Sequence, residues 1–154
     1  MPNLNWDELN NLQVGRYAEY FAKMEFASYG FEIYTSEVDD HGIDFVMKKG
    51  NNPFYEVQVK SLRESNNGNY IFMTKDKFNI NNDRLLLCFI HFRIGKLPFV
   101  YIVPSAVWKH PNEVFVSRSY QGKKSRPEWG LSYSKIHRDS MKVYLIDNYI
   151  KNLL

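Results

Sequence analysis

Residues 41–61, HGIDFVMKKGNNPFYEVQVKS, contain the pattern that decides the fold. Residues 43–48 and 54–61 are two runs with several β-branched and aromatic residues, a composition that favours strands. Between them, KGNNP at residues 49–53 is a strong turn signal. The segment is therefore predicted to form two antiparallel strands joined by a turn.

The second of these strands carries three polar side chains at alternating positions. Successive side chains of a strand point to opposite faces. Glu56, Gln58 and Lys60 therefore point one way, while Val57 and Val59 point into the core. An acid, an amide and an ammonium group thus share one face of the strand.

Two further acids can approach this face from other elements. Asp44 lies at the start of the first strand, fourteen residues before Gln58, with the turn midway. Antiparallel neighbours with this spacing place Asp44 beside Gln58 and Lys60. Glu19 lies on a helix predicted for residues 6–29, where apolar residues recur at spacings near three and four. Groups distant in sequence can therefore meet at one place.

The rest of the chain mixes helix and strand signals, which predicts an α/β fold. Asn5, three residues before Glu8, is the predicted cap of the first helix, and Gly30 ends it. Residues 93–98 join two strands as a hairpin or a crossover. The other predicted elements are strands at residues 31–35, 70–73, 85–92 and 99–103, a turn at 66–69, short helical segments at 75–78 (capped by Thr74) and 104–108, a long ordered loop at 117–133 and a final helix at 139–153.

The composition limits the class of protein. With 154 residues, of which 44% are hydrophobic, the chain can bury the core of one domain, and we expect residues 1–154 to form one. It has no apolar run of about 18 residues and no basic-then-apolar start, so we expect a cytoplasmic protein with no membrane association. The single cysteine, Cys88, lies in an apolar run and is expected to be a core thiol.

These features together resemble a known nuclease signature. Asp44, a spacer and Gln58-x-Lys60, preceded by a helical Glu19, are similar to the motif of the PD-(D/E)XK nucleases over roughly residues 12–103. Within that superfamily the chain looks nearest to Holliday-junction resolvase-like and Mrr-type restriction enzymes, some of which carry Gln in place of the motif acid. The resemblance implies a restriction-endonuclease-like core, with a central mixed β-sheet flanked by helices, and the activity of a metal-dependent DNA endonuclease.

The chemistry of such an enzyme accounts for the residue types. Phosphodiester hydrolysis needs charge neutralisation at the scissile phosphate and a deprotonated water, and a divalent metal supplies both. Mg²⁺ prefers carboxylate, carbonyl and water oxygens, and Mn²⁺ can substitute for it. Lys60 is expected to lower the pKa of the attacking water or to stabilise the transition state. The resemblance implies the catalytic residues Glu19, Asp44, Gln58 and Lys60, and the metal ligands Asp44, Gln58, the Val59 carbonyl, Glu19 and Glu56.

Most of these residues also have a plainer interpretation. Glu19 lies four positions before Lys23, so the two can form a pair on the helix surface. Asp44 can cap the entry to its strand, and Glu56 and Lys60 can simply face solvent.

Gln58 is the main departure from the nuclease motif. An amide in place of a carboxylate removes one negative charge while it keeps an oxygen donor, so metal binding should be weaker. Three hypotheses remain open. They are an active Mg²⁺-dependent DNA endonuclease, a catalytically inactive nucleic-acid-binding protein with the same fold, and an unrelated α/β scaffold for protein interaction.

The charge distribution makes nucleic acid a reasonable partner. Residues 1–58 hold 4 Lys/Arg against 10 Asp/Glu, whereas residues 59–154 hold 16 against 7. An acidic cluster beside a basic surface suits a protein that binds cations and polyanions, although two ordinary solvated faces give the same counts. Within the basic half, cations interleave with aromatic residues that can contact phosphates and stack on bases: Arg118, Tyr120, Lys123, Lys124, Arg126, Trp129 and Tyr133. The alternative is a hydrated basic loop held to the core by Trp129.

The expected chemistry also bears on assembly. Cutting both strands of DNA usually needs two active sites, so we expect a homodimer or a higher homo-oligomer. Residues 89–92 and the final helix are the candidate interface elements.

Overall fold

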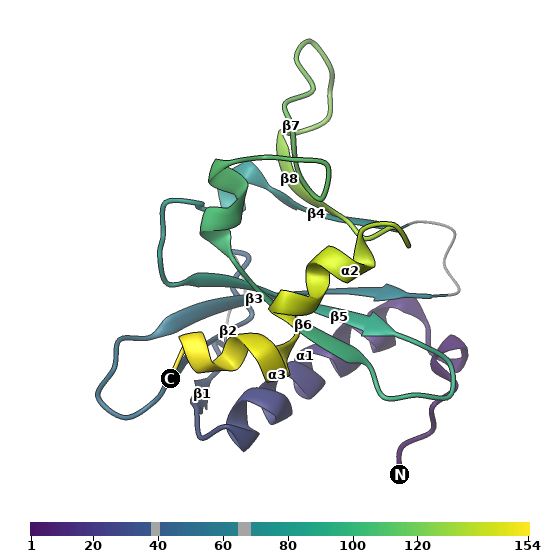
Figure 1. Ribbon diagram of the computed structural model, residues 1–154, viewed down its shortest axis with the longest axis vertical. Coiled ribbons are helices and arrows are strands. Elements are labelled where there is room, and N and C mark those ends of the chain that lie inside the picture. The colour runs from purple at the N-terminus through teal and green to yellow at the C-terminus, as the bar shows by residue number, and fades with distance from the viewer. Residues whose placement is uncertain (38–40, 65–68) are drawn as a thin grey trace.

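The computed structural model describes residues 1–37, 41–64 and 69–154, and the main sheet of this part has five strands (Figure 1). Its strands β3 and β5 run parallel, and all its other neighbouring strands run antiparallel. The predicted central mixed sheet is therefore confirmed, and residues 93–98 form a hairpin connection. In spatial order the strands are β1 (Glu32–Tyr34), β2 (Phe45–Lys48), β3 (Tyr55–Arg63), β5 (Leu85–Phe92) and β6 (Phe99–Pro104).

The main sheet is covered on both faces. Helix α1 (Asn11–Ser28) packs on one face, where its buried residues share a hydrophobic core with Val57 of β3. The opposite face is covered by a second sheet with the strand order β4-β8-β7, and Leu62 of β3 belongs to the core between the two sheets. Because side chains alternate along β3, Gln58 and Lys60 face the second sheet. The strands of that sheet are β4 (Tyr70–Thr74), β8 (Glu128–Ser132) and β7 (Phe115–Arg118).

The first helix begins later than predicted. The side chain of Asn10 accepts a hydrogen bond from the backbone N–H of Gln13, and the Gln13 side chain accepts one from the backbone of Asn10. This reciprocal capping box fixes the start of α1 at residue 11. The prediction of a helix from residue 6 with Asn5 as its cap is wrong, because the backbone is extended at Leu9 and separates α1 from the short 3₁₀ helix η1 (Trp6–Glu8).

Residues 117–133 are not a long loop. β7 and β8 pair antiparallel, with Phe115 opposite Leu131 and Arg118 opposite Glu128. The loop prediction is therefore wrong for the strand residues, and only residues 119–127 form the tip of a hairpin that projects from the molecule (Figure 1). Tyr133 follows β8 and is buried in the core, so it does not belong to an exposed basic surface.

The C-terminal segment is a series of short turns rather than one helix. It consists of α2 (Arg138–Met141), η4 (Lys142–Tyr144), α3 (Ile146–Tyr149) and η5 (Ile150–Asn152). Leu145 interrupts the series because its backbone is extended and bridges to Tyr101 of the main sheet. The predicted helix at residues 139–153 is therefore wrong in its continuity.

The remaining predictions concern short helical turns, Cys88 and residues 89–92. The short 3₁₀ helices η2 (Lys75–Lys77) and η3 (Ser105–Lys109) lie where helical turns were predicted, although the Thr74 side chain makes no capping hydrogen bond. Cys88 is fully buried, and burial raises the pKa of its thiol, which confirms a core thiol. Residues 89–92 are also buried inside the sheet, so they do not offer an interface. Of the predicted turn at 66–69, residues 66–68 lie outside the described residues. Within the described ranges, no helix is long and apolar enough to cross a membrane.

Candidate active site

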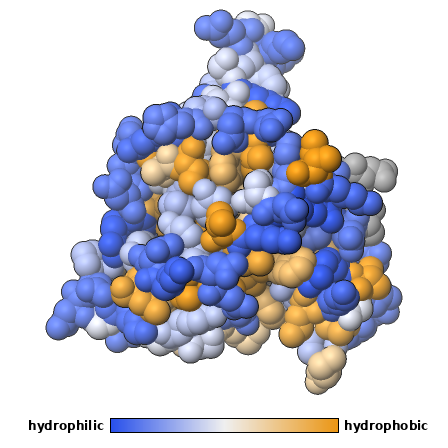
Figure 2. All heavy atoms as spheres, viewed as in Figure 1, coloured by the Kyte–Doolittle hydropathy of each residue, from blue (hydrophilic) through white to orange (hydrophobic). Residues whose placement is uncertain are grey.

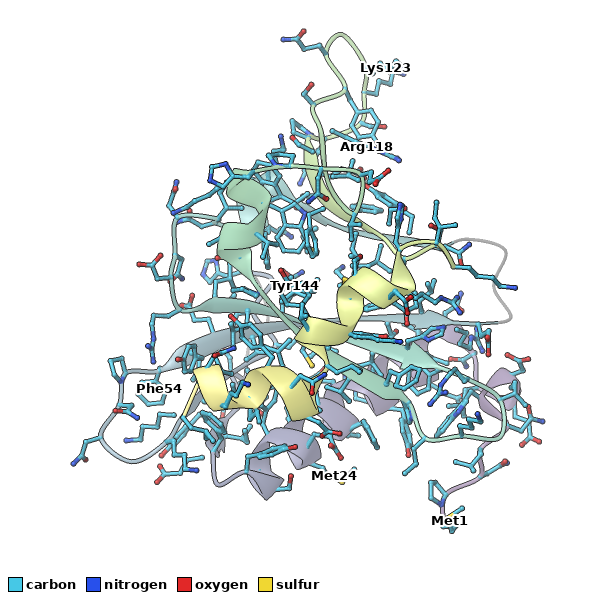
Figure 3. All side chains as sticks on the ribbon, in the orientation of Figure 1. Met1, Met24, Phe54, Arg118, Lys123 and Tyr144 are labelled. Atoms are coloured by element: carbon cyan, nitrogen blue, oxygen red, sulfur yellow. The ribbon has the colours of Figure 1, made fainter. Side chains whose placement is uncertain are left out.

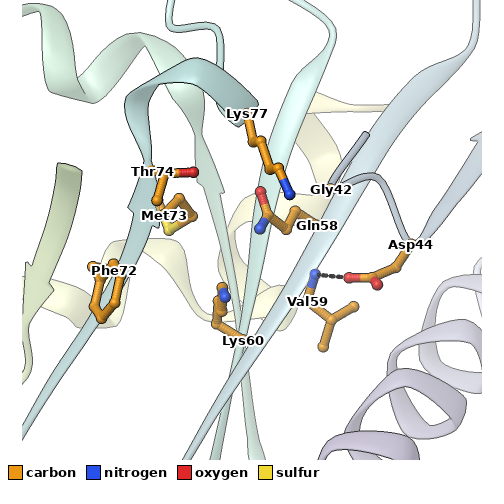
Figure 4. A pocket seen from close by; sticks show the side chains of 9 residues that line it. All are labelled: Gly42, Asp44, Gln58, Val59, Lys60, Phe72, Met73, Thr74 and Lys77. Carbon is orange, nitrogen blue, oxygen red and sulfur yellow. Dashed lines mark hydrogen bonds between the residues drawn. The ribbon is translucent and has the colours of Figure 1, made fainter. Parts of the chain in front are cut away.

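An open cavity of about 370 Å³ lies where the segment before β2 and the middle of β3 face β4 and η2. Figure 4 shows the side chains that line it. Three of the four residues that the sequence assigns to catalysis line this one cavity. Its lining is made by Gly42, Asp44, Gln58, Val59, Lys60, Phe72, Met73, Thr74 and Lys77.

Asp44 is held against the edge of β3 by two hydrogen bonds. Its backbone N–H donates to the Val57 carbonyl at 2.9 Å, and its Oδ2 accepts the backbone N–H of Val59 at 2.6 Å. The last pair of the β2–β3 ladder is Phe45 opposite Val57, so the β2 edge of β3 is open at Val59. The backbone N–H and C=O of one strand residue point toward the same neighbouring strand. Because the Val59 N–H bonds the Asp44 carboxylate, the Val59 carbonyl faces the same side.

Gln58 presents an oxygen without a partner. Its side chain is 8% exposed, and within the described part of the chain its Oε1 has no hydrogen-bond partner. A buried acceptor left in this state costs about 1–3 kcal/mol of stability. Because Gln58 lines the cavity, a ligand bound there can satisfy this oxygen.

Two lysines lie on opposite walls of the cavity. Lys60 comes from β3 and Lys77 from η2. Within the residues that the structure describes, neither ammonium group has a hydrogen bond or an ion pair. Among the described residues, the lining of the cavity therefore combines the Asp44 carboxylate with two cations.

Two of the predicted site residues lie elsewhere. The Glu19 carboxylate accepts a hydrogen bond from Lys23 Nζ at 3.2 Å and lies 3.7 Å from Arg16 Nη1, and the cavity lining does not include it. This is the helix-surface pair that the sequence left open for Glu19. Glu56 accepts a hydrogen bond from the Asn82 side-chain amide and is also outside the lining.

The second wall of the cavity was missed by the sequence analysis. Phe72, Met73 and Thr74 of β4 and Lys77 of η2 complete it. Phe72 is unusual because it is a large apolar side chain that is 48% exposed. The run at residues 70–73 was recognised as a strand, but nothing in it indicates that the strand passes in front of β3.

The base of the projecting hairpin is tied to the second sheet by cation–aromatic contacts. The Arg118 guanidinium lies 4.2 Å from the ring centre of Tyr70, and Lys75 Nζ lies 4.0 Å from that of Trp129. A side-chain hydrogen bond with Tyr120 raises the pKa of Arg118. Trp129 is half-buried against the core between the sheets, which agrees with the anchoring role that the sequence left open for it.

The tip of the hairpin is polar and exposed (Figure 2). Lys123 and Lys124 are exposed there, and Tyr120 has a positive φ of 49° where the chain turns. Figure 3 shows Lys123 on the projecting tip and Arg118 at its base. Arg126 lies 3.6 Å from Asp76, the residue that precedes Lys77 of the cavity. The hairpin therefore rises from the same sheet that forms one wall of the cavity.

The donors of the cavity suit a hard divalent ion. In the described ranges, no three His, Cys, Asp or Glu side chains converge, so these residues build no closed protein cage of the zinc type. Mg²⁺ keeps several waters and needs only one or two carboxylates together with substrate phosphates. The Asp44 carboxylate and the unpartnered Gln58 Oε1 fit that requirement.

Comparison with known proteins places the fold. No protein-family model and no curated sequence matches the chain. A bacterial homing endonuclease, I-Ssp6803I, has a similar structure with a TM-score of 0.57 and 17% sequence identity, over 94% of this chain and 92% of that chain. Hjc, a Holliday junction resolvase from Archaeoglobus fulgidus, gives a TM-score of 0.47 and 12% identity, over 82% of this chain and 94% of that chain. This chain therefore shares the overall fold of that homing endonuclease, a mixed α/β fold built on a central mixed sheet.

Proposed function

We propose that the protein is a metal-dependent endonuclease that hydrolyses phosphodiester bonds in DNA, with a role in restriction, repair, recombination or mobile-element biology. The observation that carries this proposal is the joint lining of one cavity by Asp44, Gln58, Val59 and Lys60. Asp44 directly precedes β2, and the other three residues lie on β3, in the order that the nuclease motif requires. The structural similarity to a homing endonuclease also supports a nuclease function.

Each cavity residue has a distinct task in this proposal. Asp44, with Gln58 Oε1 and the Val59 carbonyl, would hold Mg²⁺ or Mn²⁺. When bound, such an ion neutralises phosphate charge and lowers the pKa of a coordinated water. The hydrogen bond from the Val59 N–H orients the Asp44 carboxylate. Lys60 stabilises the negative charge that develops on the phosphate oxygens.

Replacing Lys60 by Met tests the proposed activity. Pure protein is incubated with plasmid, branched and single-stranded DNA in Mg²⁺ or Mn²⁺, and the products are separated on gels. We expect the wild type to cleave at least one of these substrates and Lys60→Met to cleave it about a hundredfold more slowly, because a charge-stabilising group is lost. If both proteins bind DNA equally and cut nothing, the chain is the catalytically inactive binding protein that Gln58 also allows.

The exposed hairpin is proposed to bind the DNA backbone. The hairpin forms an arm that extends from the wall of the cavity. On or beside this arm lie the cations Arg118, Lys123, Lys124 and Arg126, together with Tyr120 and Trp129. An extended basic arm suits contact with phosphates outside the cleavage site. A homodimer, with one cavity for each DNA strand, is part of the same proposal.

Removing two tip charges is expected to weaken DNA binding without affecting the cavity. The double variant Lys123→Gln with Lys124→Gln should bind DNA about tenfold more weakly near 0.1 M salt. It makes two fewer phosphate contacts, so its binding releases fewer counterions from the DNA. The slope of log affinity against log salt should fall by about two. Fluorescence anisotropy measures both quantities. The matched control is Lys142→Gln with Lys151→Gln in the C-terminal segment, and equal affinities for the two double variants would refute the role of the hairpin.

A further inference from the structure

Lys77 is a second cation of the cavity, and the nuclease motif does not account for it. It is the last residue of η2, directly beyond β4, and lines the same cavity as Asp44 and Lys60. In Figure 4 its side chain extends toward Gln58. We infer that Lys77 contacts the phosphate that is cleaved, on the side of the cavity opposite Lys60. This inference rests on the proposed nuclease function and assigns a further substrate-binding residue to it.

The position of Lys77 is fixed by the segment that leads to Asp44. Gly42 has a φ of +77°, and a Cβ at this residue would lie 3.3 Å from Lys77 Cβ and 3.5 Å from the Lys77 carbonyl oxygen. The backbone before Asp44 therefore packs directly on the aliphatic stem of Lys77. A bulkier residue at position 42 would push the two apart, so this glycine permits the close approach of η2 to Asp44.

The Lys77 ammonium group has no hydrogen bond or ion pair within the described residues. The pKa of the adjacent Asp76 is lowered by a hydrogen bond with Thr74 and by the charges of Arg126 and Lys77. Asp76, the adjacent acid, lies 3.6 Å from Arg126. Gln58, toward which Lys77 extends, is neutral. A carboxylate at position 58 would place a negative charge on the side toward which Lys77 extends, whereas the amide adds no charge there. The neutral amide of Gln58, which replaces the carboxylate of the motif, is thus compatible with a cation at Lys77.

This arrangement gives Lys77 a specific role at the phosphate. Two-metal nuclease sites use a second ion to stabilise the oxygens of the scissile phosphate. Such a site needs several carboxylates, and Asp44 is the sole carboxylate among the described residues of this lining. The ammonium group of Lys77 supplies positive charge in a lining whose described residues offer few ligands for a second ion.

The test measures DNA binding first, with metal removed by EDTA. Lys77→Met keeps the aliphatic stem that packs on Gly42 and removes the charge. Fluorescence anisotropy over a series of NaCl concentrations should show that the slope of log affinity against log salt falls by about 0.9, the value for one phosphate contact. Lys151→Met, an exposed lysine of η5, is the control and should keep the wild-type slope. Equal slopes for the two variants would overturn the inference.

A cleavage arm separates failure of the inference from failure of the proposed function. With saturating DNA and Mg²⁺, Lys77→Met should lower the single-turnover rate about tenfold or more, while Lys151→Met should not. If the wild type cleaves in a Lys60-dependent manner but Lys77→Met matches its control in slope and rate, the inference alone is wrong. If the wild type cleaves nothing while Lys77→Met still lowers the slope, the nuclease proposal is wrong and the phosphate contact is supported.

Discussion

Replacing Asp44 by Asn is expected to lower the rate of DNA cleavage by about a thousandfold or more, equivalent to about 4 kcal/mol of transition-state stabilisation. Asp44 is the one carboxylate among the described residues that line the cavity. With an amide at this position, the described residues of the lining would offer a divalent ion only neutral oxygens beside the two cations Lys60 and Lys77. Binding of Mn²⁺, measured by isothermal titration calorimetry, should be lost together with cleavage.

The same variant should remain folded. The substituted amide side chain still offers an oxygen to the Val59 N–H, so the free energy of unfolding should change by only about 1 kcal/mol, the difference between a charged and a neutral acceptor. Asp83→Asn makes the same chemical change at an exposed position and serves as the control. A variant at Asp44 that cleaves DNA and binds Mn²⁺ like the Asp83 variant would contradict the role of Asp44.

Replacing Gly130 by Ala is expected to destabilise the protein by about 3 kcal/mol, because a packed ring must move and a partly buried hydrogen bond is lost. The ring of Tyr70 lies directly on the backbone of Gly130, and a Cβ there would overlap the ring. Tyr70 cannot turn aside freely, since its hydroxyl donates to the buried carboxylate of Glu128 and its ring packs against Arg118 and Phe72. Urea unfolding followed by fluorescence measures the loss.

Gly15 provides a control of opposite sign for this prediction. It lies in α1 on the exposed side, and a Cβ there would have no atom within 4 Å. Gly15→Ala should therefore stabilise the protein by about 0.5–1 kcal/mol through the lower backbone entropy of the unfolded chain. The double variant Gly130→Ala with Tyr70→Ala should be less than additive, because the clash is removed. If Gly130→Ala is as stable as the wild type, the ring does not rest on this glycine.

The half of the site on β2 and β3 could be predicted from the sequence. The turn at residues 49–53 sets the pairing of two neighbouring strands, and the alternation along β3 places Gln58 and Lys60 on one face. These are local signals, because both depend on residues close together in the chain. Asp44 reaches this face because the pairing ends next to it, at Phe45.

The other half of the site depends on contacts that are distant in sequence. β4 is held in front of β3 by pairing with β8, where Phe72 lies opposite Gly130 and Met73 opposite Trp129. β8 is short and contains a glycine and no β-branched residue, so its sequence resembles a loop. The sequence therefore does not predict that Phe72, Thr74 and Lys77 lie at the cavity. Glu19 shows that a residue can match a motif position without lying at the site. Its carboxylate pairs with Lys23 on the helix surface.

The most direct test of the account is the location of a bound metal. Crystals of the protein grown with Mn²⁺ are expected to show an anomalous-scattering peak in the cavity, about 2 Å from a carboxylate oxygen of Asp44 and from Gln58 Oε1. The peak should disappear in the Asp44→Asn protein. A Mn²⁺ ion bound elsewhere, or a cavity that contains no peak at millimolar Mn²⁺, would contradict the claim that these residues form a metal-binding nuclease centre.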